Sequence, residues 1–132
     1  ECIMLPMADA PPNPTVLVVE DNPLNMKLTT DLLQLNGFAV LQAADGETAL
    51  ELANTHRPVL VLLDIHLPGM DGVEVFRKLK AGAGHQGIKI IALTASAMRE
   101  EEEHIRAMGF DQFIAKPINT RQFIPTIRQV LR

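Results

Sequence analysis

Five residues whose side chains can do chemistry each follow a short apolar segment of this sequence. Glu20 and Asp21 follow TVLVV, Asp64 follows VLVLL, Thr94 follows IKIIAL and Lys116 follows DQFIA. A carboxylate at the edge of an apolar core costs free energy unless it is paired, hydrogen-bonded or bound to a metal. What stabilises these acids, Asp64 above all, is therefore the question that the sequence raises.

The acids determine which chemistry this set of residues can support. Carboxylates that lie close together repel one another, so a cluster of them takes up either a proton or a cation. Cys and His are missing at ligand spacing around the acids, and oxygen ligands favour a hard ion, Mg²⁺ before Zn²⁺. A lysine and a hydroxyl beside such an ion suit a phosphoryl group. A carboxylate is also a competent nucleophile that forms an aspartyl-phosphate.

Alternating strands and helices are predicted to position these residues. Period-2 and fully apolar segments predict strands, and helical spacing after a capping residue predicts helices, with caps at Asn22, Asp45 and Asn119. The predicted strands are 15–19, 38–43, 59–63, 88–93 and 111–115, and the predicted helices are 23–35, 46–56, 72–80, 96–107 and 120–131. Strict alternation predicts an α/β fold with a parallel sheet covered on both faces. The residues that follow the strands then gather along one edge of the sheet, where ligands of open α/β sheets bind.

Three helices carry more detailed predictions. In helix 23–35 the leucines at helical spacing predict the buried face, and Met26 is the better candidate for an exposed contact; these leucines are Leu24, Leu28, Leu32 and Leu35. Pro125 is expected to bend helix 120–131, because it removes one backbone donor. In helix 96–107, Glu102 lies one turn before Arg106 and can pair with it.

Composition bounds the class of protein. The chain has 132 residues, 47% hydrophobic and 21% charged, which suits one globular domain. A formal net charge of -4 argues against direct binding of nucleic acid. No apolar run approaches the roughly 20 residues that span a bilayer. The single cysteine, Cys2, cannot form an internal disulfide. We expect a cytoplasmic protein that neither crosses nor binds a membrane.

The N-terminal segment is predicted to lie outside the domain. Prolines cluster before residue 15 and no periodic apolar face is present. We expect residues 1–14 to form a flexible tail and residues 15–132 to form the domain. The first residue is not Met, which indicates a fragment, an edited chain or added residues, and Met7 is a candidate native start.

Four segments resemble the signatures of response-regulator receiver domains. They are VLVVEDNPLN, LVLLDIHLPGMDG, IIALTA and FIAKPI. The resemblance covers residues 15–131 and is closest to single-domain regulators of the DivK type. It implies a (βα)5 doubly wound sheet with the flavodoxin-like strand order 2-1-3-4-5. It also implies a phosphoacceptor response regulator of a two-component phosphorelay.

The resemblance implies a role for each residue of the site. Asp64 would accept a phosphoryl group from a phosphohistidine on a sensor histidine kinase or histidine phosphotransfer protein. Asp21, Asp64 and the backbone carbonyl of His66 would ligate Mg²⁺, which Mn²⁺ can replace, while Glu20 acts mainly through water. Lys116 would pair with the phosphoryl group, and its bond to Pro117 would be cis.

The resemblance also implies a conformational switch. Thr94 would move to bond the phosphoryl group, and Phe113 would swing inward. These movements would change the face formed by the fourth helix, the fifth strand and the fifth helix. A downstream protein would recognise that face. Physically this is a two-state equilibrium biased by contacts to the phosphoryl oxygens. His66 and Ser96 occupy positions that tune phosphoryl lifetime in this family. The protein is then a signalling switch, and the only reactions that it catalyses are its own phosphorylation and slow autodephosphorylation.

Alternatives remain open. A haloacid-dehalogenase-like phosphatase needs a second acid two residues after the nucleophile, where this sequence has His66. A nucleotide-binding protein needs a glycine-rich loop, and EDNPLN has no glycine. A degenerate receiver would bind partners without phosphorylation, although all five pocket residues are present. Within the family, the alternative is a receiver domain cut from a hybrid histidine kinase or a longer response regulator.

Overall fold

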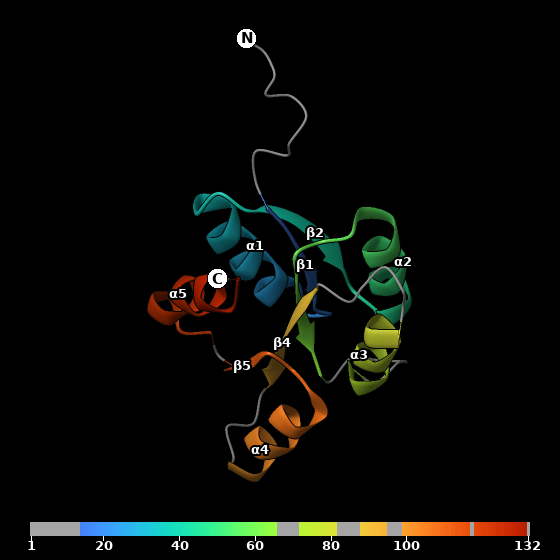
Figure 1. Cartoon of the computed structure of the whole chain (residues 1–132). Coiled ribbons are helices and arrows are strands. Elements are labelled where there is room, and N and C mark those ends of the chain that lie inside the picture. The colour runs from blue at the N-terminus through green and yellow to red at the C-terminus, as the bar shows by residue number, and fades with distance from the viewer. Residues whose placement is uncertain (1–13, 66–71, 82–87, 95–98, 117, 132) are drawn as a thin grey trace.

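The computed structural model describes residues 14–65, 72–81, 88–94, 99–116 and 118–131, with the backbone alone at 99–102. Within this part of the chain, strands and helices alternate strictly, as predicted (Figure 1). The strands are β1 (Thr15–Val19), β2 (Ala39–Ala43), β3 (Leu60–Asp64), β4 (Lys89–Thr94) and β5 (Gln112–Ala115). The helices are α1 (Pro23–Leu35), α2 (Gly46–His56), α3 (Gly72–Ala81), α4 (Arg99–Met108) and α5 (Thr120–Leu131).

The strands form one parallel sheet. Its order is β2-β1-β3-β4-β5, and every neighbouring pair is parallel. The predicted fold class, an α/β doubly wound sheet of order 2-1-3-4-5, is confirmed. The carboxyl ends of all five strands therefore point to the same edge of the sheet.

The helices begin where capping residues were predicted. Asn22 Oδ1 accepts hydrogen bonds from the backbone N of Leu24 at 2.9 Å and of Asn25 at 3.2 Å, with Pro23 at the first helical position. Asp45 and Asn119 cap α2 and α5 in the same way. Each cap supplies an acceptor for backbone donors that the first turn leaves unpaired. Helix α5 continues through Pro125.

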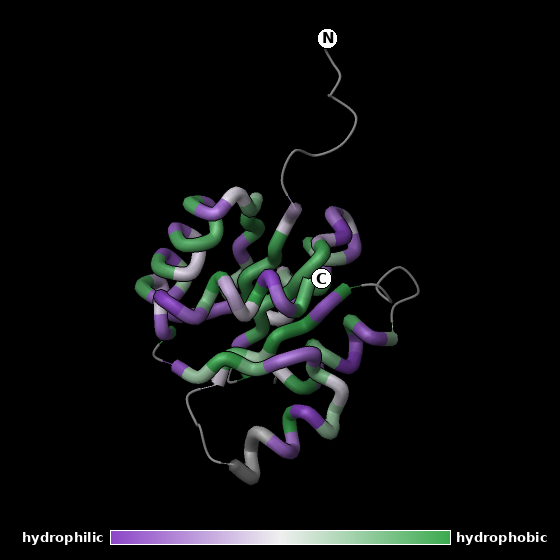
Figure 2. The backbone as a smooth tube through the Cα atoms, turned by 60° about the vertical axis from the view of Figure 1, so that its left-hand side comes forward, coloured by the Kyte–Doolittle hydropathy of each residue, from purple (hydrophilic) through white to green (hydrophobic). Residues whose placement is uncertain are grey.

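Helices cover both faces of the sheet. One apolar cluster packs the sheet against α2, α3 and α4, and the other packs it against α1 and α5. Figure 1 shows α1 and α5 on one side of the strands and α2 and α3 on the other. The backbone is most hydrophobic along the strands, and hydrophilic segments alternate with hydrophobic ones along the helices (Figure 2). Burial on both faces explains why the strand sequences are continuously apolar.

The predicted buried face of α1 was wrong at three of its four leucines, and right at Leu32, which is half-buried and packs against the core. Leu24 is 78% exposed and Leu35 82% exposed, whereas Leu33 is fully buried. Thr29 and Thr30 are buried beside Leu33, and Met26 packs against the same cluster, so Met26 is not the exposed contact. A further finding explains one of the inward threonines: Gln42 Nε2 on β2 donates a hydrogen bond to Thr30 Oγ1 at 2.9 Å. The helix thus packs a partly polar face on the sheet, and three of its leucines point outward, at Leu24, Leu28 and Leu35.

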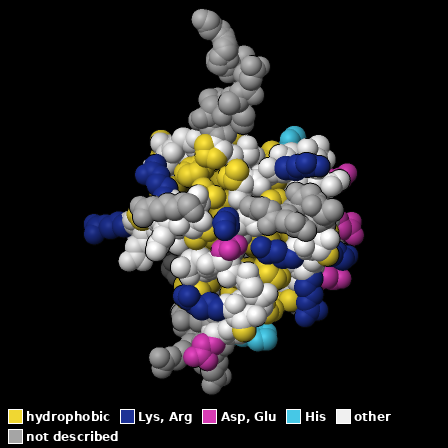
Figure 3. Space-filling view, in the orientation of Figure 1, with side chains coloured by type: hydrophobic (Ala, Val, Ile, Leu, Met, Phe, Trp, Pro, Cys, Tyr) yellow, Lys and Arg dark blue, Asp and Glu magenta, His cyan; other side chains and the backbone are white. Residues whose placement is uncertain are grey.

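The surface carries mixed charge. On the face in Figure 3, lysine and arginine side chains are spread over several elements rather than gathered in one patch. In the part of the chain that the structure describes, none of the helices has both the length and the apolar character needed to cross a membrane.

Candidate functional site

The register of the sheet brings the ends of its strands to one level. Val19 lies opposite Leu63, so the residues that follow them, Glu20 and Asp64, leave the sheet side by side. On the next pair, Thr94 lies opposite Ala115, and the backbone N of Lys116 donates to the carbonyl oxygen of Thr94 at 2.7 Å. Parallel pairing therefore assembles residues from four strands, as the sequence predicted.

Three carboxylates form the centre of this edge. Ligand oxygens of Glu20, Asp21 and Asp64 all lie within 4.8 Å of one another. Glu20 is 2% exposed and Asp64 is 4% exposed, whereas Asp21 is open to solvent. Two acids are thus buried at the end of the sheet and the third borders solvent, which gives the cluster access from one side.

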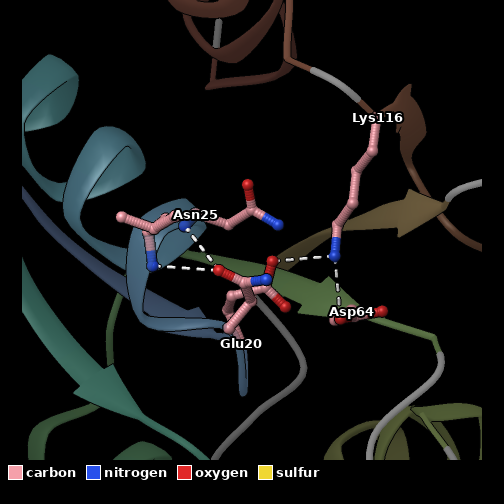
Figure 4. Close-up of polar contacts among 6 residues, drawn as sticks. Glu20, Asn25, Asp64 and Lys116 are labelled. Atoms are coloured by element: carbon pink, nitrogen blue, oxygen red, sulfur yellow. Dashed lines mark hydrogen bonds and ion pairs between the residues drawn. The ribbon is translucent and has the colours of Figure 1, made fainter.

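Lys116 bridges the two buried acids. Its Nζ lies 2.7 Å from Glu20 Oε1 and 2.9 Å from Asp64 Oδ2. Figure 4 shows the lysine extending from the end of β5 to a point between Glu20 and Asp64, with Asn25 of α1 nearby. One ammonium group faces two carboxylates, so the site holds more negative than positive charge when both acids are ionised.

The surroundings shift the pKa of both partners of this pair. Burial raises the pKa of Glu20 to about 7, and the neighbouring carboxyl of Asp64 adds to this effect, against the opposing pull of Lys116. For Lys116, burial lowers the pKa, but the hydrogen bonds and charges of Glu20 and Asp64 outweigh burial and leave its pKa raised. The lysine therefore stays charged, while Glu20 binds a proton near neutral pH unless a cation takes its place.

The donor set fits a hard divalent ion. Glu20 Oε2 is fully buried and accepts no hydrogen bond from the residues that the structure describes. A buried acceptor without a donor is costly, and a cation close to the cluster removes that cost. All the side-chain ligands are carboxylate oxygens, the ligand type of Mg²⁺ and Ca²⁺ rather than of Zn²⁺ or Cu²⁺.

Gly72 holds the segment that carries Asp64 against the start of α3. Its backbone N donates to the carbonyl oxygen of Ile65 at 3.0 Å. A Cβ at Gly72 would lie 2.6 Å from the carbonyl oxygen of Asp64 and 2.6 Å from Ile65 Cα. The sequence predicted a helix that begins at Gly72, as observed, but the close approach of this glycine to the backbone of Asp64 was missed.

Thr94 and Phe113 lie on strands beside the acid cluster. Thr94 is the last residue of β4 and is fully buried. Phe113 on β5 is half-buried, packs against the core on the α2, α3 and α4 side, and lies under the guanidinium of Arg106. The sequence analysis gave Arg106 a different partner, Glu102, whose side chain lies outside the described residues. No local sequence pattern links Arg106 to Phe113, because their contact crosses from α4 to β5.

Other predictions concern residues that the structure does not describe. The carbonyl of His66, the side chain of Ser96 and the Lys116–Pro117 bond all involve positions outside the described part of the chain. The same holds for the predicted tail, of which the described residues include Pro14 alone.

Comparison with known proteins identifies the family of this chain. The model of the response regulator receiver domain matches residues 16–128. The chain belongs to the response regulator receiver domain family. The receiver is 45% identical over 117 residues to the polar-differentiation response regulator DivK of Brucella anthropi, covering 89% of this chain and 95% of that protein.

Solved structures agree with this assignment of the receiver. The chemotaxis response regulator CheY4 of Vibrio cholerae superposes with a TM-score of 0.84 at 27% identity, over 89% of this chain and 98% of that one. The receiver domain of a sensor histidine kinase of Pseudomonas aeruginosa superposes with a TM-score of 0.82 at 30% identity, over 90% and 98% of the two chains. That structure has a magnesium ion coordinated in its active-site cleft. This chain is thus a receiver domain of two-component signalling.

Proposed function

We propose that this receiver accepts a phosphoryl group from a phosphohistidine onto Asp64 and thereby switches the binding of a partner. The observation that carries the proposal is the position of the Asp64 carboxylate, which is 4% exposed, paired with Lys116 at 2.9 Å and clustered with two further acids. Receiver domains of response regulators interact with histidine kinases and downstream effectors. The proposed donor is therefore a sensor histidine kinase or a histidine phosphotransfer protein.

The transfer exchanges one bond for another. A carboxylate oxygen of Asp64 forms a bond to phosphorus while the bond between phosphorus and the donor imidazole nitrogen breaks. The electron pair of that bond stays on the imidazole, and the product is an aspartyl-phosphate. Attack of water on phosphorus later returns the Asp64 carboxylate and releases inorganic phosphate.

The neighbouring residues neutralise the charge that this exchange concentrates. Lys116 already contacts Asp64, and its ammonium pairs with a phosphoryl oxygen once the group is in place. Asp21 and Asp64 would hold Mg²⁺ directly, with the carbonyl of His66, and Glu20 would act through water. When bound, the ion supplies positive charge to the phosphoryl oxygens. The buried, unpaired Oε2 of Glu20 supports the presence of such a cation.

The change at Asp64 is proposed to reach a surface through β4 and β5. Thr94 ends β4 next to Lys116, and Phe113 lies three residues before Lys116 on β5. Movement of Thr94 toward the phosphoryl group leaves space for Phe113 to turn inward. The face made by α4, β5 and α5 then differs between the two states, and a downstream protein reads that difference. We take residues 15–132 as the folded unit, in line with the match over 16–128.

Incubation with Mg²⁺ and a small phosphodonor, followed by intact mass measurement, tests this function. We expect one phosphoryl adduct that is stable to acid and labile to alkali, absent in Asp64→Asn and reduced without Mg²⁺. Asp45→Asn is the matched control, because Asp45 is an exposed acid whose capping role asparagine can fill. An adduct of equal yield in Asp64→Asn would contradict the proposal.

A further inference from the structure

Arg106 on α4 and Phe113 on β5 form a contact outside the acid cluster. The guanidinium carbon of Arg106 lies 5.1 Å from the centroid of the Phe113 ring. Arg106 Nη2 also donates to Gln112 Oε1 at 3.3 Å. The same oxygen accepts from the backbone N of Phe113 at 3.1 Å. One guanidinium is thus tied both to the face of the ring and, through Gln112, to the backbone that carries the ring.

Packing alone does not enclose the Phe113 ring. The residue is half-buried, and it borders a cavity of about 300 Å³ between β5 and α5 whose other lining residues include Ala115, Gln122 and Phe123. The ring also lacks the hydroxyl with which a tyrosine would hydrogen-bond. Its position therefore depends on apolar contact with the core and on the attraction between its π face and the arginine.

We propose that Arg106 is a positioning residue that holds Phe113 at the surface in the unphosphorylated receiver. This inference rests on the proposed function, in which Phe113 turns inward when Asp64 is phosphorylated. Inward movement breaks the contact between the cation and the ring, and the exposed guanidinium of Arg106 is left without its aromatic partner. Arg106 thus favours the resting state and lowers the fraction of molecules that are ready to bind a phosphoryl group.

The direction of the expected effect distinguishes this role from a structural one. A ligand that binds one of two states has an apparent dissociation constant equal to its intrinsic value divided by the fraction of that state. Removal of the arginine increases the fraction of the inward state and so tightens binding at Asp64. General damage to packing between α4 and β5 would weaken binding instead.

The test measures binding of beryllofluoride, a phosphoryl analogue, at saturating Mg²⁺. We expect Arg106→Met, which keeps an apolar stem but no charge, to bind about two- to fivefold more tightly than wild type, as the strength of an exposed cation–π contact predicts. Lys80→Met is the matched control, because Lys80 Nζ lies 5.9 Å from the Phe76 ring centroid, away from the site. That variant should bind as wild type does.

A double-mutant cycle assigns the effect to the ring. Phe113→Leu keeps an apolar side chain without a π face, and in that background Arg106→Met should change the beryllofluoride affinity by less than in wild type. Equal affinity of Arg106→Met and wild type, or the same change in both backgrounds, would overturn the positioning role. Failure of wild type itself to bind beryllofluoride and to form the phosphoryl adduct would instead overturn the proposed function.

Discussion

At the scale of single residues, the site keeps a carboxyl group where folding alone would not favour one. Glu20 is buried, its Oε2 lacks a donor among the described residues, and burial raises its pKa to about 7. Lys116 offsets part of this cost, but it also pairs with Asp64. Such perturbed groups in a cluster are typical of functional sites. A bound cation, as proposed above, would relieve the unfavourable environment of Glu20.

Gly72 gives a residue-scale prediction. Gly72→Ala places a methyl group 2.6 Å from the backbone oxygen of Asp64, and backbone atoms on both sides must shift to relieve the contact. We expect a loss of about 1–3 kcal/mol in the free energy of unfolding. We also expect Mg²⁺ affinity to fall about tenfold or more, as it does when the support of a ligand is disturbed. Chemical denaturation and calorimetric titration of Mg²⁺ measure the two effects.

Gly37 provides the control for this variant. A Cβ at Gly37 meets no atom within 4 Å, but its φ of +88° strains any other residue. Gly37→Ala should therefore cost about 1–2 kcal/mol of stability and leave Mg²⁺ affinity unchanged. If Gly72→Ala kept wild-type Mg²⁺ affinity, the glycine would serve only the start of α3 and not the position of Asp64.

At the scale of elements, α1 supplies a matched pair of leucines. Leu33 is fully buried in the cluster under α1 and α5, and Leu35, two residues later, is 82% exposed. Leu33→Ala should lower the free energy of unfolding by about 2–5 kcal/mol because it leaves a cavity. Leu35→Ala should change it by less than about 0.5 kcal/mol. Equal effects in denaturant unfolding would show that the assigned inward face of α1 is wrong.

The same helix shows where sequence-based prediction reached its limit. The strands, the caps at Asn22, Asp45 and Asn119, and the convergence of the acids with Lys116 were predicted, because they depend on local patterns and on the geometry of parallel sheets. The inward face of α1 was not, because the leucine spacing ignored two threonines that pack on the sheet and one hydrogen bond from Gln42. The contact of Arg106 with Phe113 likewise depends on how α4 lies on β5, which no local pattern encodes.

At the scale of the whole molecule, two apolar clusters stabilise the sheet along its length. Repulsion among the clustered carboxylates opposes this stabilisation at the carboxyl ends of the strands. The clusters hold both faces of the sheet, so strand ends cannot separate to relieve repulsion among the acids without loss of burial. The fold thus keeps the carboxylates together in the absence of any cation. Stability of the entire domain should then depend on what neutralises them.

That dependence predicts how the free energy of unfolding changes with pH. The folded pKa of Glu20, about 7, lies above its ordinary value of 4.5, so its contribution is fully present below about pH 4.5 and is lost as pH rises through 7. Without Mg²⁺, we expect stability to fall by on the order of 2 kcal/mol between pH 5 and pH 8. Glu20→Gln should remove that part of the fall, since it cannot ionise. All other titratable groups are common to the two proteins, so the difference between the two profiles isolates Glu20. At pH 8, Mg²⁺ at 100 times its dissociation constant for wild type should raise the free energy of unfolding of wild type by about 2.7 kcal/mol. The same Mg²⁺ concentration should raise the free energy of unfolding of Glu20→Gln by less. Denaturant unfolding at each pH measures these values, and parallel profiles for the two proteins would contradict the raised pKa.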